Sequence, residues 1–244
     1  MKQSIYAESA VPLYPVGTRM PTSDRVFRYA HLGNAVTEWY GLFTFMPTTE
    51  IHVLTVNAPV GTTVLHSLSI AAIAADKYKG GYAVCSQPWD MIGKIKSNTG
   101  CGAGEAFTIT LEEPIWRQMT TATSCTLYTS EYYDVRTIVG HAEYPGFGTF
   151  VGVALRTFQA DYYGWLQTWG PCPVMGQGPA GALTGERGMY FWMNDGSVIN
   201  QPTVGAGPDF ALQYAGELLP FTGPVGATHD LLHSKIFLNL HIKP

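Results

Sequence analysis

The sequence predicts an all-β protein of the β-sandwich or barrel type, with two β subdomains and an extended N-terminal arm. Its 27 Gly and 16 Pro residues punctuate the 244-residue chain at short intervals, and these two residue types are the strongest breakers of regular structure. Between them lie short runs rich in Val, Ile, Thr, Phe and Tyr, which favour strands. Many short strands separated by turn signals are typical of sandwiches and barrels.

The expected strands, in chain order, cover residues 25–30, 50–56, 63–70, 81–86, 91–96, 106–111, 124–128, 150–155, 163–168 and 235–242. Alternation is clearest in the sixth run, where Phe107, Ile109 and Leu111 share one face of the strand and threonines occupy the other. Helical candidates are few, and we expect only residues 33–41 and 228–233 to form short helices.

The expected arm covers residues 1–22. Three prolines exclude a regular helix there, and its apolar side chains need a surface that covers them. That surface belongs either to a neighbouring subunit or to the arm's own domain, on which it would form a first edge strand. We expect the rest of the chain to form two β subdomains, residues 23–140 and 141–244, separated by a charged segment that ends in Gly-Phe-Gly.

Charged residues are unusually scarce. The chain has 14 Lys and Arg and 18 Asp and Glu, or 13% of its residues, where soluble proteins carry roughly 25%. A surface so poor in charge is open to association with other protein surfaces. The formal net charge of −4 argues against nucleic acid as a partner, because phosphate contacts need a surplus of Lys and Arg. We also expect no secretory signal and no membrane span, since Gly and Pro interrupt the apolar stretches.

The four cysteines, Cys85, Cys101, Cys125 and Cys172, are far apart in the sequence and form no C-x-x-C pair. Zinc knuckles and thioredoxin-type redox sites both need close pairs, so neither is indicated. Cysteine is often buried as a small apolar residue. We therefore favour free, buried thiols over disulfides, in a protein made in a reducing cytoplasm.

Motifs for catalysis or cofactor binding are weak. The glycines at 176–181 match G-x-G-x-x-G, but prolines surround them and no helix follows to receive a pyrophosphate. His229 and His233 have a zinc-ligand spacing without the glutamate of a zinc hydrolase. Glu112 and Glu113 would point to opposite faces of a strand, so they are no ready acid/base pair. We expect no catalytic residue, no cofactor and no metal, with glycan binding or cleavage as the enzyme-class alternative.

The run from Tyr162 to Pro171 is apolar on both faces if it is a strand. Tyr163, Trp165 and Gln167 would lie on one face, opposite Leu166. A strand packed between two layers explains this pattern best. A subunit contact or a ligand platform is the alternative.

Several short motifs, in order from about residue 16 to residue 172, resemble those of a group of tailed-bacteriophage virion structural proteins. The group is known mostly from phage genomes and viral metagenomes. The motifs are Gly17-Thr18-Arg19, the run from Asp24 to Ala30 (DRVFRYA), Tyr78-Lys79-Gly80-Gly81-Tyr82, Lys94-Ile95-Lys96-Ser97-Asn98 and the run from Tyr162 to Pro171 (YYGWLQTWGP). The pattern departs from the group at residues 34–40 and in the long Gly- and Pro-rich segment after Pro173, whereas the final run Ile236-Phe237-Leu238-Asn239-Leu240 resembles the group's end.

The resemblance implies a non-enzymatic component of a phage particle and brings no catalytic residues. Size, β content and low charge lead us to expect a capsid cement or decoration protein that bridges capsid subunits; a tail or baseplate protein is the structural alternative. The expected partners are the major capsid protein or other virion subunits and further copies of the chain, with a trimer favoured. Expected interface residues are Leu13, Tyr14, Val16, Arg19, Arg25, Phe27, Arg28, Tyr29, Trp165 and Trp169.

Overall fold

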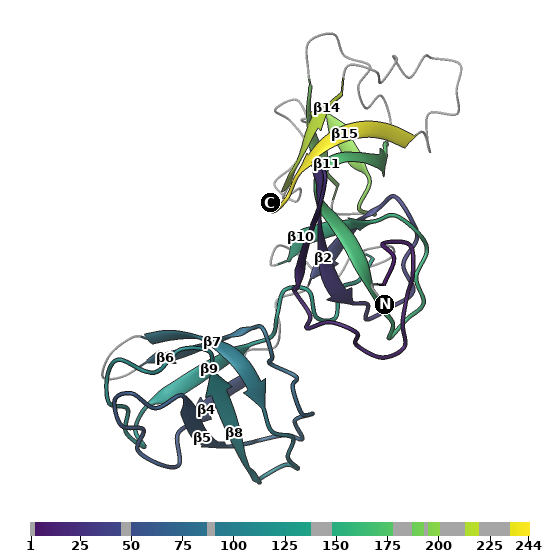
Figure 1. The fold of residues 1–244 in the computed structure, drawn as a ribbon. Coiled ribbons are helices and arrows are strands. Elements are labelled where there is room, and N and C mark those ends of the chain that lie inside the picture. Colours follow the sequence, from purple (N-terminus) through teal and green to yellow (C-terminus); the bar gives the residue numbers. More distant parts are fainter. Residues whose placement is uncertain are drawn as a thin grey trace, which may run out of the picture. The chain divides into compact units, whose positions relative to one another are not determined.

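The computed structural model describes residues 3–44, 50–86, 91–137, 148–177, 187–192, 195–200, 213–219 and 235–244. These residues form fifteen β-strands and no helix, in two curled antiparallel sheets (Figure 1). The predicted all-β fold of the sandwich or barrel type is confirmed. In chain order the strands are β1 (Arg19–Thr22), β2 (Arg25–His31), β3 (Gly41–Thr44), β4 (Glu50–Val53), β5 (Val64–Leu68), β6 (Tyr82–Ser86), β7 (Met91–Asn98), β8 (Ala106–Leu111), β9 (Ser124–Tyr128), β10 (Thr149–Ala154), β11 (Tyr163–Met175), β12 (Gly188–Phe191), β13 (Val198–Asn200), β14 (Gln213–Leu218) and β15 (Lys235–His241).

Each of the ten predicted runs overlaps a strand, and the bounds of β8 and β9 agree residue for residue with the prediction. The sequence pattern missed β1, β3, β12, β13 and β14. Four of these five strands have at most four residues, and β3 is buried along its whole length. A strand covered on both faces shows no alternation of apolar and polar residues, so the pattern had nothing to detect in β3.

The first helical candidate was wrong, because residues 33–41 form no helix. Val36 and Phe158 instead exchange backbone hydrogen bonds of 3.0 and 3.1 Å, and Trp39 has a positive φ of 73°. Pairing with a distant segment overrides the local helical preference here. The second candidate, residues 228–233, lies outside the described residues. No helix in the described part of the chain could cross a bilayer.

The chain divides into two compact units. Unit 1 consists of Met1–Phe45 and Tyr132–Pro244, and unit 2 is Met46–Glu131, inserted within unit 1. This division differs from the expected subdomains 23–140 and 141–244, whose boundary lies outside the described residues. The difference has a physical cause: β2 and β3, early in the chain, pair with β11 and β10, which follow the insertion.

The sheet of unit 1 is organised around the long strand β11. The strand order is β1-β2-β11-β15-β14-β12-β13, and β10 links β11 to β3. The first half of β11 pairs with β2 and the second half with β15, with a register shift between Gln167 and Trp169. Next to this irregularity, Gly170 has a φ of +85°, and a Cβ there would lie 2.0 Å from the carbonyl oxygen of Asp24. Only glycine fits this position without strain.

Unit 1 is packed on both faces of this sheet. Trp165 lies in one apolar cluster with Phe27 and Tyr29, whereas the next residue, Leu166, lies in a second cluster with Ala30. Successive residues of a strand point to opposite faces, so the two clusters lie on opposite sides of β2 and β11. The interpretation of residues 163–168 as a strand buried between two layers is therefore confirmed.

Unit 2 is a six-stranded sheet in the order β4-β9-β6-β7-β8-β5. The sheet curls so that its two ends meet, and an isolated bridge joins Leu54 to Ser67. One apolar cluster fills the inside, with Phe107, Ile109 and Leu111 among its members. Their predicted common face is thus the inner face of β8.

The expectation of free cysteines holds for only two of the four. Cys85 on β6 and Cys125 on β9 lie opposite each other in the strand register and form a disulfide. Cys101 and Cys172 are free. Burial raises the pKa of the Cys172 thiol far above its ordinary value, which keeps this thiol protonated and unreactive.

Candidate interaction surfaces

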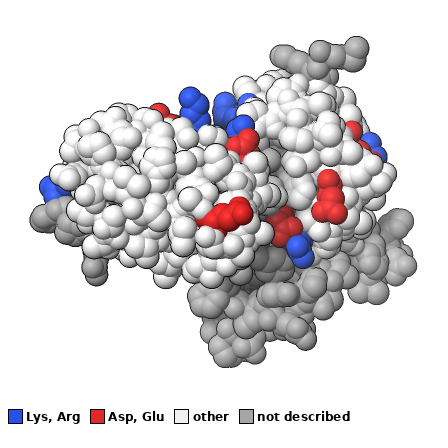
Figure 2. Space-filling model, turned by 90° about the horizontal axis from the view of Figure 1, so that it is seen from below, with Lys and Arg blue, Asp and Glu red and all other residues white. Residues whose placement is uncertain are grey.

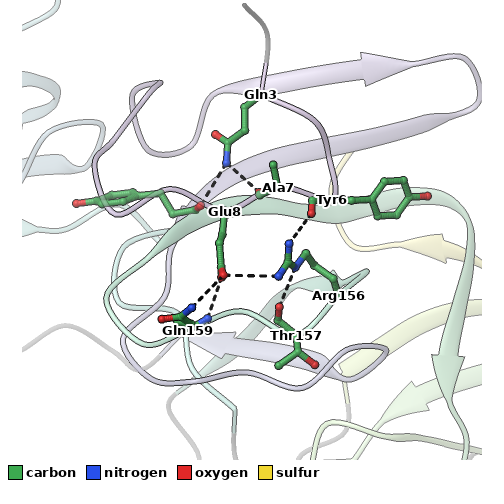
Figure 3. Close-up of polar contacts among 8 residues, drawn as sticks. Gln3, Tyr6, Ala7, Glu8, Arg156, Thr157 and Gln159 are labelled. Carbon is green, nitrogen blue, oxygen red and sulfur yellow. Dashed lines mark hydrogen bonds and ion pairs between the residues drawn. The ribbon is translucent and has the colours of Figure 1, made fainter.

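The N-terminal segment lies on its own unit. Ser9 and Tyr163 exchange backbone hydrogen bonds of 3.0 and 2.8 Å. The side-chain amide of Gln3 donates to the carbonyl oxygen of Ala7 at 2.9 Å and to that of Tyr163 at 3.4 Å (Figure 3). Arg19–Thr22 continues this segment as the edge strand β1. Of the two alternatives for the arm, this single chain therefore adopts the fold onto its own domain.

Tyr14 fixes the segment to the aromatic core. Its ring centroid lies 5.3 Å from that of Tyr29 and 5.2 Å from that of Trp165. The Tyr14 hydroxyl accepts a hydrogen bond from the Gln3 backbone N–H at 3.2 Å, and the Tyr29 hydroxyl accepts one from the Leu13 N–H at 3.2 Å. Burial raises the pKa of Tyr29. Aromatic pairs at such separations contribute about 0.5–1.5 kcal/mol beyond their buried area.

A polar latch holds residues 6–8, and Figure 3 shows its members. The Glu8 carboxylate accepts a hydrogen bond from the Gln159 N–H at 3.0 Å and lies 3.5 Å from the Arg156 guanidinium. Arg156 also donates to the Tyr6 carbonyl oxygen at 2.7 Å. The Glu8 side chain is only 14% exposed, so this ion pair is less screened than an ordinary surface pair.

The structure divides the ten expected interface residues into three groups. Phe27, Tyr29 and Trp165 are at most 1% exposed and belong to the core, so in this folded chain they are not available to a partner. Tyr14 and Val16 pack partly buried against the two apolar clusters. Arg25, Arg28 and Trp169 are half-buried, and Leu13 and Arg19 are exposed.

The half-buried members make contacts within the chain. Arg28 donates to the carbonyl oxygens of Gly17 at 3.3 Å and Pro244 at 3.1 Å. Trp169 stacks on His241 with ring centroids 4.6 Å apart. Arg28 therefore ties together the two ends of unit 1, a structural role that explains its position without a partner.

Exposed apolar side chains are concentrated in unit 2. Nine of the thirteen exposed large apolar side chains of the described residues belong to this unit. Figure 2 shows one face of the molecule on which uncharged residues cover most of the surface and charged residues are few and scattered. The nine are Ile51, Val53, Val56, Val60, Leu68, Ile70, Tyr82, Ile92 and Trp116. The alternation of residues along the expected strand 50–56 indicated that one face of this strand would be exposed. It did not reveal which of the two faces of the strand would point into the core.

A second feature is an aromatic cluster in unit 1 around His31, which sequence reasoning did not identify. The imidazole stacks on the ring of Tyr133 at 4.9 Å and lies 4.8 Å from the ring of Tyr163. Nδ1 of His31 is buried without a hydrogen-bond partner. The segment after unit 2 brings Tyr133 here, because the backbone N–H of His31 donates to the Tyr132 carbonyl oxygen at 2.9 Å.

The electrostatics of this cluster, which we call the His31 cluster, follow from burial and two carboxylates. Burial lowers the pKa of His31, and the carboxylates of Asp134 and Asp161 partly oppose this effect. Burial also raises the pKa of Tyr133 and of Tyr163, with smaller contributions from nearby negative charge. The cluster therefore presents a neutral imidazole and two protonated phenols beside carboxylates. Stacking and hydrogen bonding are the interactions that these groups can offer to a ligand.

Metal binding finds no support in the described part of the chain, where no group of three His, Cys, Asp or Glu side chains is placed to hold an ion. The His229 and His233 pair lies outside that part, as does most of the G-x-G-x-x-G segment. Comparison with protein-family models, with curated proteins and with solved structures finds no match to this chain. The surfaces described above and the resemblance of the sequence motifs therefore carry the functional argument.

Proposed function

We propose that the protein is a non-enzymatic structural component of a tailed-phage virion, a cement or decoration protein that bridges and stabilises neighbouring capsid subunits. Its partners are the major capsid protein or other virion subunits, and its place of action is the particle. The series of motifs from Gly17 to Pro171 supports a particle component. The character of the exposed surface supports an adhesive role.

One observation carries the proposal: the gathering of exposed large apolar side chains on unit 2. Singly scattered apolar side chains are normal on a protein surface, whereas several that lie together commonly mark interaction sites. Full burial of a Val, Ile or Leu side chain contributes about 1.5–3 kcal/mol, and a side chain that is already half-covered gains about half of that. Several such side chains together are sufficient for specific adhesion.

The mechanism needs no chemistry. A protein that binds the assembled shell but not the free subunits stabilises the shell by mass action, by about 2.7 kcal/mol per site at a hundredfold excess over Kd. Icosahedral symmetry repeats each weak contact many times, which raises the overall avidity. A low surface charge suits this role, because it limits repulsion between closely spaced copies.

Co-sedimentation tests the proposal directly. Purified protein is mixed with purified shells of the phage that encodes it and centrifuged, and the bound protein is quantified. We expect saturable binding with a fixed number of copies per shell, and an increase in the temperature at which shells open. If the protein stays in the supernatant at every concentration, the proposal is refuted. Electron microscopy of labelled protein separates a head position from the tail or baseplate alternative.

The His31 cluster favours glycan binding as a second candidate function. Stacked aromatic rings beside carboxylates offer both the apolar face and the hydrogen-bond acceptors that a sugar ring uses. Titration calorimetry with host surface polysaccharide tests this candidate. If the candidate is right, heat of binding is measured and Tyr133→Ala abolishes it. An absence of heat at millimolar sugar excludes the candidate.

A further inference from the structure

Four strands of unit 2 align one row of outward-facing side chains. The register pairs Ile51 on β4 with Thr126 on β9, Thr126 with Val84 on β6, and Val84 with Ile92 on β7. Paired residues of neighbouring antiparallel strands point to the same face. Ile51 is 58% and Ile92 70% exposed, so the row lies on the outer face of the sheet. We call this face the outer row surface.

Two further rows flank the first. One contains Val53, Ser124 and Ser86, and the other Tyr128, Tyr82 and Lys94. Val53 is 52% and Tyr82 47% exposed. The rows therefore extend the apolar centre with hydroxyl groups on both sides. Polar groups around an apolar centre are the usual arrangement of a protein interface.

Charged residues are few in the described part of this surface. Among the described residues of the three rows, Lys94 is the only charged one, and its ammonium lies 3.3 Å from the Glu112 carboxylate. A charged partner surface would find no counter-charge in the rows, and burying an unpaired charge is costly. The described rows therefore favour an uncharged, apolar occupant with a few hydroxyl groups.

We infer that the outer row surface binds the same surface of a second copy of this chain, about a two-fold axis, in place of the trimer favoured in the sequence analysis. A two-fold contact places a surface against itself. Two copies of a largely uncharged row can pack against each other without repulsion between like charges. A second outer row surface is itself apolar with a few hydroxyl groups, which is the composition that the rows favour in a partner. Two sheet faces pack in this way about 10 Å apart, as in β-sandwiches. The inference rests on the proposed function for its role in the particle, where it would link neighbouring bound copies.

The size of the surface predicts how strong the contact is. With strands about 4.8 Å apart and rows about 7 Å apart along the strand, it covers roughly 300–400 Å². A stable interface of standard size buries about 800 Å² on each partner. The contact is therefore weak in free solution and becomes effective where a shell holds copies side by side.

Sedimentation equilibrium of the purified full chain between about 20 and 500 µM tests the inference. We expect a monomer–dimer equilibrium for the wild type. Ile92→Lys places a charge in the central row and should raise the dimer Kd at least tenfold. The matched control is Val60→Lys, which changes an apolar residue of unit 2 that lies outside the rows and is 61% exposed, against 70% for Ile92; it should change the Kd less than twofold. Ile92→Thr, a strand-forming neutral variant, should give an intermediate Kd.

Circular dichroism of each variant verifies that it is folded. We expect the variants at Ile92 to fold, because this side chain is exposed and lies outside the core. A wild type that stays monomeric at 500 µM overturns the inference, as does a trimer or an Ile92→Lys variant that dimerises like the wild type. Co-sedimentation with shells tests the proposed function separately. A monomer that still binds shells refutes only the two-fold contact, whereas a dimer that binds no shell refutes only the virion role.

Discussion

Tyr14 lies with its ring centroid 5.2 Å from the indole of Trp165, which is itself 1% exposed. This contact ties the N-terminal segment to the strand that organises unit 1. The expected arm is therefore an integral layer of the fold in the single chain. Under the proposed function, contact with shell partners would fall to the exposed side chains of unit 2 and to those of the arm that face solvent, such as Leu13.

Replacing Tyr14 should destabilise unit 1. Tyr14→Ala removes two aromatic contacts and the acceptor of the Gln3 N–H, and we expect a loss of about 2–3 kcal/mol in the free energy of unfolding. The exposed neighbour Leu13 provides the control, because Leu13→Ala should cost less than about 0.5 kcal/mol. Urea unfolding followed by tryptophan fluorescence measures both. Equal stability of the two variants would show that the arm is not part of the core.

Breaking the polar latch should release residues 6–8. Glu8→Ala removes the acceptor of the Gln159 N–H and the partner of Arg156, and we expect cleavage near the N-terminus by a nonspecific protease to become several times faster. Glu112→Ala removes an exposed ion pair with Lys94 in unit 2 and should leave the rate unchanged. Mass spectrometry of the fragments reports the site. A Glu8→Ala protein that is cleaved no faster than wild type contradicts the assigned role of the latch.

Unit 1 should lose stability in mild acid because of His31. Burial lowers the pKa of His31 below its ordinary value of 6.5, so the unfolded chain binds the proton more readily than the folded one. The resulting loss begins as the pH falls below about 6.5 and is complete once the pH is below the lowered pKa of the folded state. His31→Phe keeps a ring in the stack and removes the titration. Urea unfolding at pH 7.5 and pH 5 should show a smaller acid loss for this variant; an equal loss would exclude His31 as the cause.

Reduction should destabilise unit 2 selectively. The disulfide closes a loop with a sequence separation of 40, for which loop entropy gives a stabilisation of about 2–4 kcal/mol. Reductant or the Cys85→Ser/Cys125→Ser variant should therefore lower the unfolding midpoint of unit 2 and leave that of unit 1 unchanged. Alkylation of the denatured, unreduced chain should label the two free cysteines, Cys101 and Cys172. Labelling of all four cysteines would contradict the pairing.

Local patterns in the sequence were sufficient to predict the strands that have one inner and one outer face. β8 is an example, since Phe107, Ile109 and Leu111 alternate with threonines and fill the core of unit 2. The insertion of unit 2 left no local pattern, because it depends on the pairing of β2 with β11, more than a hundred residues apart. The disulfide depends in the same way on the register of β6 and β9, which spacing along the chain does not reveal.

The candidate surfaces were harder to predict than the fold. Large aromatic residues are typical both of interfaces and of cores, and this ambiguity applies to Phe27, Tyr29 and Trp165. They belong to the core because apolar clusters cover both faces of β2 and β11, and the sequence of a single strand does not reveal this. In unit 2 the opposite holds. Ile51 and Ile92 have the character of buried strand residues, yet the curl of the sheet turns both outward. The way the whole sheet closes determines which face of a strand points into the core. The sequence of one strand alone does not contain this information.

Cryo-electron microscopy of shells incubated with the purified protein shows both whether the chain binds the shell and through which surface. We expect additional density at symmetry-related positions on the shell, with exposed apolar side chains of unit 2 covered by neighbouring subunits. Shells that remain bare at saturating protein, or density in which all of unit 2 faces solvent, would contradict the proposed function.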